Sequence, residues 1–470
     1  MNFKDFFVSG LIITLPVISS FGQKKIGSRP NVLFFVIDDL NDWISVLNKD
    51  NPIKMPNLEK LAKEGVLFTH AYCSSPACNP SRSSVLTGTR PHKTGIYGNS
   101  SDWRKALPDA VTLQRYFKDN GYFVCGSGKI FHHQQDWAFH DNASFNEYLV
   151  MSINEPYPDK KLNRLESLGG RNWDWGAWPA NIEKTVDYRT AEYAVQKLHQ
   201  DFDHPFFLNV GIYKPHSPHF APQKYFDEYP LMDLKMPLLT KDDCDDLPTG
   251  AITLMKDAHW WETMLKSQKI NPDAYREFVQ AYQSCATFAD DMIGKVMKAL
   301  NSSPYKNNTI IILWSDNGFH LGEKEHIEKF ALWEKTTHVP FIIIAPGVTK
   351  AGTIISNPVD LTTIYPTLTD LCGLKTPAGI EGFSIVPLLK DQSVKTPPAL
   401  MTYLKGNHAI RTDRWRFIHY ADGSEELYDH SKDENEWYNL ANNAKNKELL
   451  DSLRIFIPTF NADQVPDLKR

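Results

Sequence analysis

Two apolar segments, each ending in a pair of polar residues, constrain the fold of this chain more than any other feature. Residues 31–37 read NVLFFVI and stop at Asp38-Asp39, and residues 309–315 read TIIILWS and stop at Asp316-Asn317. Short runs that are apolar on both faces are typical of central strands in a mostly parallel sheet. Sites in open α/β sheets form beyond the carboxyl ends of such strands. One pair alone could be a helix cap or a turn, but two pairs at two strand ends favour a shared site.

Further segments complete an α/β pattern. Residues 206–212 and 341–347 are similar apolar runs, and helical patterns lie between the runs, at 55–65, 110–121, 189–200 and 273–300. This alternation predicts a large sheet flanked by helices. Beyond about residue 395 the pattern changes to short alternating strands and a closing helix at 445–457. We therefore expect a large domain at 28–394 and a small α+β domain at 395–470.

The N-terminus predicts export. Lys4 precedes an apolar stretch from Phe6 to Ile18, and the small residues Ser20 and Gly22 follow at positions that a signal peptidase reads. This pattern favours a cleaved signal peptide over residues 1–22 and a secreted or periplasmic protein, with a retained membrane anchor as the alternative. The net charge of −5, without long basic runs, argues against a nucleic-acid partner. Six cysteines are too few for a disulfide scaffold in an exported chain of 470 residues.

The polar residues at the two strand ends are all oxygen donors. Asp38, Asp39, Asp316 and Asn317 offer three carboxylates and one amide oxygen, with no imidazole or thiolate among them. Such a set favours a hard cation such as Ca²⁺ over zinc. We expect these four residues to be metal ligands.

Cationic and imidazole side chains lie in loops that follow apolar runs. Taken singly, a lysine or histidine of this kind is more often a surface or structural residue. Their shared position in loops marked by Gly or Pro makes them candidates for catalysis: Arg82, Lys129, His132, His216 and Lys329.

The stretch CNPSRSSVLTG, residues 78–88, reads as a polar loop and places Cys78 four residues before Arg82. This stretch resembles the signature of the type I sulfatases, in which a formylglycine-generating or sulfatase-maturing enzyme oxidises the cysteine to Cα-formylglycine. Residues 31–42, 126–133 and 313–326 resemble other elements of that family, and residues 99–104, 121–132 and 214–222 resemble its iduronate-2-sulfatase-like branch. The resemblance implies an alkaline-phosphatase-like fold, one Ca²⁺, and Cys78 as both nucleophile and metal ligand.

The resemblance also implies roles for the candidate residues. A formylglycine hydrate carries two hydroxyls: one attacks sulfur and expels the sugar alcohol, and the other then loses its proton so that the carbonyl re-forms and sulfate leaves. Arg82 would hold the hydrate, and Lys129 and Lys329 would bind the sulfate oxygens. His132 would be the base that collapses the sulfated hydrate, and His216 would assist the leaving oxygen. Asn317 stands where iduronate-2-sulfatase relatives often carry histidine, yet it still supplies an oxygen.

The expected substrate is a sulfated carbohydrate, such as an oligosaccharide derived from ulvan or a glycosaminoglycan. Residues near the motifs are candidates for the walls of its pocket: Trp103, Arg104, His133, Trp137, His219, His320 and Trp333. Two alternatives remain: a phosphate or phosphonate monoester hydrolase of the same superfamily, and a catalytically inactive carbohydrate-binding relative. A cysteine protease that uses Cys78 would not explain the two acidic pairs.

Overall fold

A computed structural model of the chain describes residues 29–132, 139–150, 157–256 and 260–467. Its centre is an eight-stranded sheet in the order β13-β2-β12-β9-β1-β7-β4-β5. Strands β9, β1, β7, β4 and β5 pair in parallel, whereas β12 is antiparallel to both of its neighbours. The strands are β1 (Asn31–Asp38), β2 (Val66–Phe68), β4 (Phe123–Gly128), β5 (Glu147–Leu149), β7 (Phe206–Pro215), β9 (Thr309–Ser315), β12 (Phe341–Ile344) and β13 (Thr353–Ile355).

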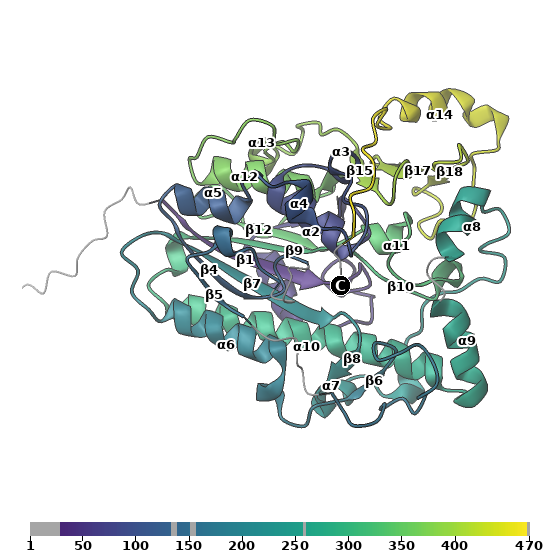
Figure 1. Cartoon of the computed structure of the whole chain (residues 1–470), viewed down its shortest axis with the longest axis horizontal. Helices are drawn as coiled ribbons and strands as arrows, with labels where there is room; N and C mark the ends of the chain where they lie inside the picture. Colours follow the sequence, from purple (N-terminus) through teal and green to yellow (C-terminus); the bar gives the residue numbers. More distant parts are fainter. Residues whose placement is uncertain (1–28, 133–138, 151–156, 257–259, 468–470) are drawn as a thin grey trace, which may run out of the picture.

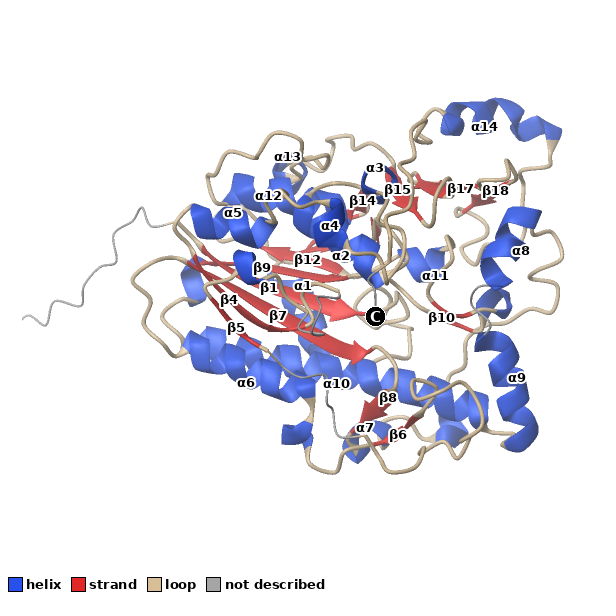
Figure 2. Cartoon of the chain, in the orientation of Figure 1, coloured by secondary structure: helices blue, strands red, loops and turns tan. Residues whose placement is uncertain are grey.

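Helices cover both faces of this sheet, as the two apolar faces of β1 require (Figures 1 and 2). Leu33, Phe35 and Ile37 pack into one core cluster with α6 (Val186–Leu198) and α10 (Ala274–Ser302). The alternate residues Val32, Phe34 and Val36 pack into a second cluster, with α2 (Cys78–Thr87), α5 (Leu113–Asp119) and α12 (Ile364–Leu371). The expected α/β fold with a large mixed sheet is confirmed.

A smaller antiparallel sheet follows near the C-terminus. It consists of β15 (Ala399–Thr402), β16 (His408–Arg411), β17 (Trp415–His419) and β18 (Glu425–Asp429). Helix α14 (Lys447–Arg454) packs on it through Leu450 and Leu453, which contact a cluster that includes Phe417 and Leu427. This confirms a small C-terminal α+β unit, while its boundary at residue 395 stays a prediction.

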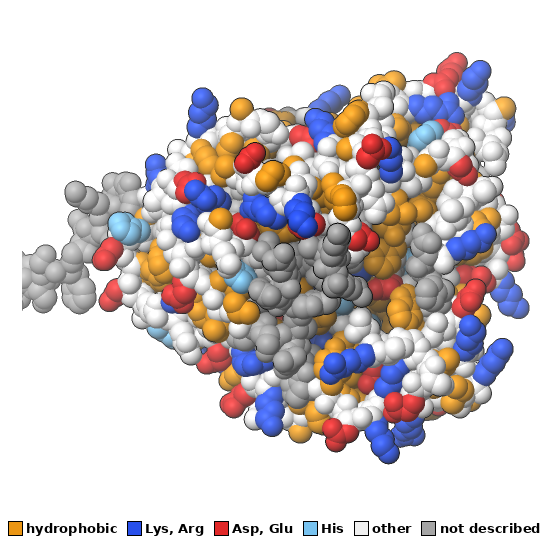
Figure 3. All heavy atoms as spheres, in the orientation of Figure 1, with side chains coloured by type: hydrophobic (Ala, Val, Ile, Leu, Met, Phe, Trp, Pro, Cys, Tyr) orange, Lys and Arg blue, Asp and Glu red, His pale blue; other side chains and the backbone are white. Residues whose placement is uncertain are grey.

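Shorter elements make up the other helices and strands of the described residues. Three two-stranded sheets pair β3 (Ala71–Tyr72) with β14 (Val359–Asp360), β6 (Trp175–Ala177) with β8 (His219–Ala221), and β10 (His320–Leu321) with β11 (Ile327–Glu328). The remaining α-helices are α1 (Pro56–Glu64), α3 (Pro91–Thr94), α4 (Trp103–Ala106), α7 (Gln223–Phe226), α8 (Thr249–Lys256), α9 (Trp260–Ile270), α11 (Glu334–Thr337) and α13 (Val386–Lys390). Basic and acidic side chains are interspersed over the face drawn in Figure 3.

The stretch that reads as a polar loop is a buried helix, so this expectation was wrong. All ten residues of α2, from Cys78 to Thr87, are buried. Pro80 lies in the first turn, where its missing N–H would have no helical partner. Gly88 ends the helix in the left-handed region at φ 69° and donates its N–H to the Ser84 carbonyl.

The expected signal peptide, residues 1–22, lies outside the described residues. Within the described ranges, no helix is both long and apolar enough to cross a bilayer.

Candidate active site

Four neighbouring strands of the large sheet lead into several of the predicted site residues. β9, β1, β7 and β4 are consecutive in the sheet and parallel. The register pairs Ile37 with Ser315 and Gly128 with Gly211, so these strands end at the same edge. Asp38, which ends β1, and Lys129, which follows β4, therefore meet at the carboxyl edge, where such sheets form their sites.

An acidic cluster lies at this edge. One ligand atom from each of Asp38, Asp39, Cys78 and Asp316 lies within 4.8 Å of the others. Asn317 is also buried, and its Oδ1 has no hydrogen-bond partner within the described residues. A buried amide oxygen without a hydrogen-bond partner lowers the free energy of unfolding. A cation bound to this oxygen would supply the missing interaction. Three carboxylates and this oxygen suit a hard cation such as Ca²⁺.

Two cationic side chains, Arg82 and Lys129, hold Asp38 and Asp316 in place. Arg82 donates from Nε to Asp316 Oδ2 at 2.6 Å and from Nη2 to Asp38 Oδ1 at 3.1 Å. Lys129 Nζ lies 2.5 Å from Asp38 Oδ2. Burial acts to raise the pKa of Asp38, but the charges of Lys129 and Arg82 hold it well below its usual range. Burial dominates at Asp316 and raises its pKa to about 7, despite Arg82.

Cys78 is the first residue of α2 and is fully buried. Its Sγ lies 3.0 Å from Lys329 Nζ and 3.7 Å from Asp39 Oδ1. Burial raises the pKa of the thiol well above its ordinary value, although Lys129 and Lys329 act against this. The unmodified side chain is thus a neutral thiol rather than the thiolate that a cysteine nucleophile requires. The first N–H groups of α2 add positive potential at this position.

The two predicted catalytic histidines lie beside this cluster. His216 Nε2 is 3.8 Å from Asp39 Oδ2, and its Nδ1 is 2.7 Å from the Ser217 carbonyl. Burial, with the charge of Lys329, lowers the pKa of His216 to about 4, so the imidazole is neutral at pH 7. His132 is nearly buried, and its ring centroid lies 6.3 Å from that of Phe139.

A cavity of about 720 Å³ opens from this cluster. Lys129, His132, His216 and Lys329 are among the residues that line it. Aromatic and polar side chains line the remainder: Asn99, Phe139, Tyr157, Arg171, Asn172, Trp173, Trp175, Tyr213, His219, Trp260, Phe278, Phe319 and Glu328, among others. The lining combines cationic side chains with many aromatic ones, which suits an anionic ester of a ring-containing alcohol.

Comparison with known proteins now decides the family. The sulfatase family model matches residues 30–374. The chain belongs to the sulfatase family. It is a sulfuric ester hydrolase, and the predicted resemblance to type I sulfatases is confirmed. A second family model, for the C-terminal region of N-sulphoglucosamine sulphohydrolase, matches residues 322–461.

Individual proteins agree with this family. A sulfatase of Formosa agariphila is 38% identical over 94% of this chain and 88% of its own length. Human iduronate 2-sulfatase is 29% identical over 74% of this chain and 70% of its own length. The solved structure of a phosphonate monoester hydrolase from Agrobacterium radiobacter has a TM-score of 0.74 at 20% identity, covering 90% of this chain and 94% of that one. This last likeness shows the shared fold alone.

The sulfatase places its predicted pocket residues in different environments. His219 lines the cavity. Trp103 instead lies in the core, where its ring stacks on Phe131 at 5.1 Å. Arg104 covers the Trp103 ring at 4.2 Å and pairs with Asp141 at 2.7 Å.

Two further pocket candidates are buried behind the loop that carries Lys329. His320 packs edge-on against Trp333 at 5.7 Å, and the Trp333 indole N–H donates to Glu426 Oε2 at 2.9 Å. These contacts turn both side chains toward the protein interior rather than toward a ligand. His133 and Trp137 lie outside the described residues.

Sequence reasoning missed many of the aromatic residues that line this cavity. Trp173 and Trp175 belong to the segment NWDWGAW, whose density of tryptophan in a Gly-rich context was the available signal. Trp260 begins α9, and Glu328 directly precedes Lys329. Burial raises the pKa of Glu328 to about 7, although Lys329 lowers it.

Glu436, from the C-terminal unit, fastens both ends of the segment that carries Lys329. Its carbonyl oxygen accepts from Lys324 Nζ at 2.5 Å, and its carboxylate accepts from the Glu334 N–H at 2.8 Å. Four non-glycine residues of this segment lie in the left-handed region, at φ 50–88°: Lys324, Glu325, Glu328 and Phe330. Such backbone persists only where its surroundings hold it.

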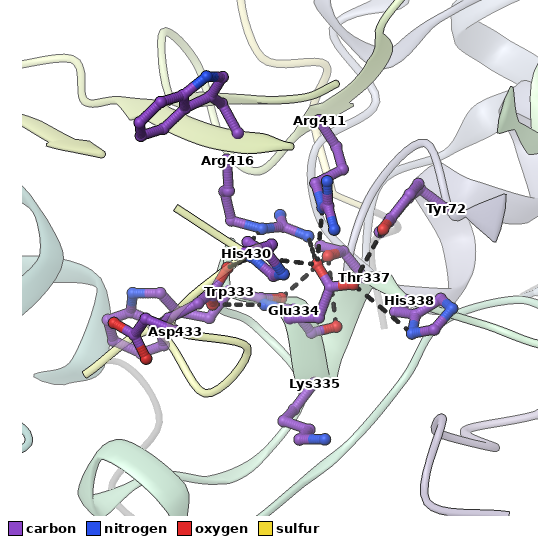
Figure 4. Close-up of polar contacts among 12 residues, drawn as sticks. Tyr72, Trp333, Glu334, Lys335, Thr337, His338, Arg411, Arg416, His430 and Asp433 are labelled. Carbon is purple, nitrogen blue, oxygen red and sulfur yellow. Dashed lines mark hydrogen bonds and ion pairs between the residues drawn. The ribbon is translucent and has the colours of Figure 1, made fainter. Parts of the chain in front are cut away.

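Charged groups of both units surround Glu334 (Figure 4). Glu334 pairs with Arg416 and accepts a hydrogen bond from the Tyr72 hydroxyl at 2.9 Å. Arg416 donates to the Leu332 carbonyl at 2.8 Å and pairs with Glu436 at 2.6 Å. All of these side chains are buried. The small sheet thereby contributes to the placement of Lys329.

Proposed function

We propose that this sulfatase hydrolyses a sulfate ester of a saccharide, with Cys78 converted to Cα-formylglycine as the nucleophile. The observation that carries the proposal is the position of Cys78 at the first turn of α2. There its Sγ lies 3.0 Å from Lys329 Nζ and within 4.8 Å of the ligand atoms of three aspartates. The name of the human relative, iduronate 2-sulfatase, and the aromatic cavity support a sugar sulfate.

The chain's own residues bind and orient the ester. Formylglycine supplies a hydrate whose hydroxyl is the nucleophile. Lys129 and Lys329 neutralise sulfate oxygens as charge develops in the transition state. Arg82 was expected to hold the hydrate, but its guanidinium contacts Asp38 and Asp316, so we assign it to positioning these carboxylates.

The histidines and the metal ligands complete the proposal. We assign His216, which is neutral at pH 7, to hydrogen-bond the leaving oxygen, and His132, which also lines the cavity, to take up a proton from the hydrate. Asp38, Asp39, Asp316 and Asn317, with the modified residue 78, would hold Ca²⁺. A bound divalent cation lowers the pKa of a coordinated hydroxyl and offsets negative charge on sulfate.

Export and maturation belong to the same proposal. We infer that residues 1–22 direct the chain to the periplasm or the exterior. We also infer that a formylglycine-generating or sulfatase-maturing enzyme acts on Cys78. Ulvan-derived and glycosaminoglycan-derived oligosaccharides are the candidate substrates.

Two measurements on the purified enzyme test this function. Mass spectrometry of the Cys78 peptide should show the loss of mass that accompanies conversion to formylglycine, and an ion assay should show sulfate release from a sulfated oligosaccharide. Cys78→Ala should fold and bind the oligosaccharide without releasing sulfate. Full sulfate release by Cys78→Ala would overturn the nucleophile assignment. Faster cleavage of a phosphonate monoester would favour the rival hydrolase, and saccharide binding without any cleavage would favour the inactive relative.

A further inference from the structure

Two buried polar atoms line the cavity without a partner. Trp175 Nε1 and His219 Nε2 have no hydrogen-bond partner within the described residues, and their side chains are 3% and 2% exposed. Trp175 on β6 and His219 on β8 are register partners in the two-stranded sheet, so they lie side by side. An unpaired buried donor costs about 1–3 kcal/mol, so each such atom calls for an explanation.

Aromatic packing holds these two side chains in place. The Trp175 ring meets Trp173 edge-on at 5.3 Å and Phe278 edge-on at 5.5 Å. His219 meets Phe278 at 5.0 Å and Phe319 at 5.8 Å, both edge-on. Burial lowers the pKa of His219 to about 3, so its ring is neutral. Neither ring can turn toward another hydrogen-bond partner without breaking these contacts. A partner for these two atoms must therefore come from a molecule bound in the cavity.

Arg171 also lines this cavity, and no carboxylate of the described residues pairs with its guanidinium. Lys129 and Lys329 also line the cavity, but each pairs with an aspartate. The Arg171 guanidinium instead lies over the Tyr157 ring at 3.5 Å, and that ring packs edge-on against Phe220 at 6.0 Å. Arg171 is exposed and is pre-oriented by this stacking.

The segment that presents Arg171 is tightly organised. Asp174 accepts backbone N–H bonds from Leu162 and Asn163, at 3.2 and 3.0 Å. Lys161 Nζ donates to the carbonyls of Leu168 and Trp173 at 2.5 and 3.1 Å. These bonds tie both ends of the segment together and bring Arg171 and Trp175 to one cavity.

We propose that Trp175, His219 and Arg171 form a saccharide subsite for a second anionic group in this cavity. This subsite proposal rests on the proposed function and specifies the substrate class of the enzyme. Trp175 Nε1–H and His219 Nε2 bind oxygens of the sugar, and Arg171 binds a carboxylate or second sulfate in addition to the ester that is cleaved. Arginine suits such planar or multi-oxygen anions because it donates several hydrogen bonds in a fixed geometry. A sulfate ester of a cationic alcohol would leave Arg171 facing a like charge.

Binding to Cys78→Ala tests this subsite without requiring turnover. The probes are three matched sulfated disaccharides: one with a uronate carboxylate, one with a second sulfate and one with a neutral sugar. Calorimetry should show that one or both dianionic probes bind more tightly than the neutral one. Adding Arg171→Gln should reduce that preference roughly ten-fold, as expected for a hydrogen bond between charged groups. The probe whose advantage disappears identifies the anion.

Matched variants separate recognition from packing. Trp175→Phe removes the indole N–H and should weaken binding of every saccharide probe roughly five-fold or more. Trp103→Phe removes a buried indole N–H that also lacks a described partner, but in the core, and is its control. Arg164→Gln, an exposed arginine outside this cavity, is the control for Arg171. Equal affinity for all three probes, an unchanged preference in Arg171→Gln, or no saccharide binding would overturn the subsite. Sulfate release by the wild-type enzyme tests the proposed function separately.

Discussion

The ammonium nitrogen of Lys329 lies 3.0 Å from the sulfur of Cys78, although 251 residues separate them in the chain. The same nitrogen lies 2.8 Å from both carboxylate oxygens of Asp39. Burial acts to lower the pKa of Lys329, but the negative charge of Asp39 holds it well above the ordinary value. A permanent cation therefore faces the side chain of residue 78, the proposed site of the nucleophile.

Replacing this cation should impair chemistry more than folding. We expect Lys329→Met to lower kcat by roughly 10²–10³-fold, as does loss of a transition-state hydrogen-bond donor elsewhere. Inhibition by inorganic sulfate should also weaken. Steady-state kinetics with sulfate as product inhibitor measure both effects. Lys295→Met, which removes a partly exposed lysine paired with Glu192, is the control. Near-normal kcat in Lys329→Met would contradict the assignment.

Glu436 should act on the reaction through Lys329. Glu436→Gln weakens the attachment of the segment 324–334, so we expect lower kcat/KM, weaker inhibition by sulfate and a loss of roughly 3 kcal/mol in unfolding free energy. Asp429→Asn, which breaks the 2.5 Å pair with Arg414 in the same small sheet, is the control for stability.

A double-mutant cycle distinguishes positioning by Glu436 from general destabilisation. If Glu436 acts through Lys329, adding Glu436→Gln to Lys329→Met should weaken sulfate inhibition little further. Additive effects of the two substitutions on sulfate inhibition, at a temperature where both proteins are folded, would show that Glu436 is structural only.

Metal removal should abolish activity reversibly. Oxygen ligands without a soft donor predict one Ca²⁺ per chain. A calcium chelator should therefore stop sulfate release, and added Ca²⁺ should restore it. Asp39→Ala should be inactive under all conditions. Elemental analysis of the active enzyme checks the identity of the metal, and stoichiometric zinc without calcium would refute the prediction.

Asp290 should make stability depend on pH. This carboxyl on α10 accepts the N–H groups of Asn57 and Leu58 at the start of α1, and burial raises its pKa to about 6 despite these bonds. The folded pKa exceeds the ordinary 3.8, so the stabilising contribution of Asp290 is complete below pH 4 and is lost as the pH rises through 6. The advantage of wild type over Asp290→Asn should fall by up to about 3 kcal/mol between pH 4 and 7. Urea unfolding at several pH values measures this, with Asp291→Asn as control. A pH-independent difference would be the contrary result.

The sequence by itself determined the α/β fold and indicated the residues of the acidic cluster. The runs that end at Asp38 and Asp316 are apolar on both faces, and this local pattern is sufficient to place them as central parallel strands. Parallel neighbours end at the same edge, so adjacency of the two acidic pairs followed from the fold class. The Cys78 to Gly88 stretch was recognised from its residue types alone.

Only the tertiary structure decided which surrounding side chains face the substrate. Asn, Pro and Ser are weak helix formers, so α2 was read as a loop, but burial between α12 and the large sheet stabilises it as a helix. Trp103 and Trp175 look alike in sequence, yet Phe131 stacks on one and the cavity borders the other. Glu436 reaches the Lys329 segment only because the small sheet packs there. Such contacts join residues far apart in the chain, so the conformational preferences of the local sequence do not predict them.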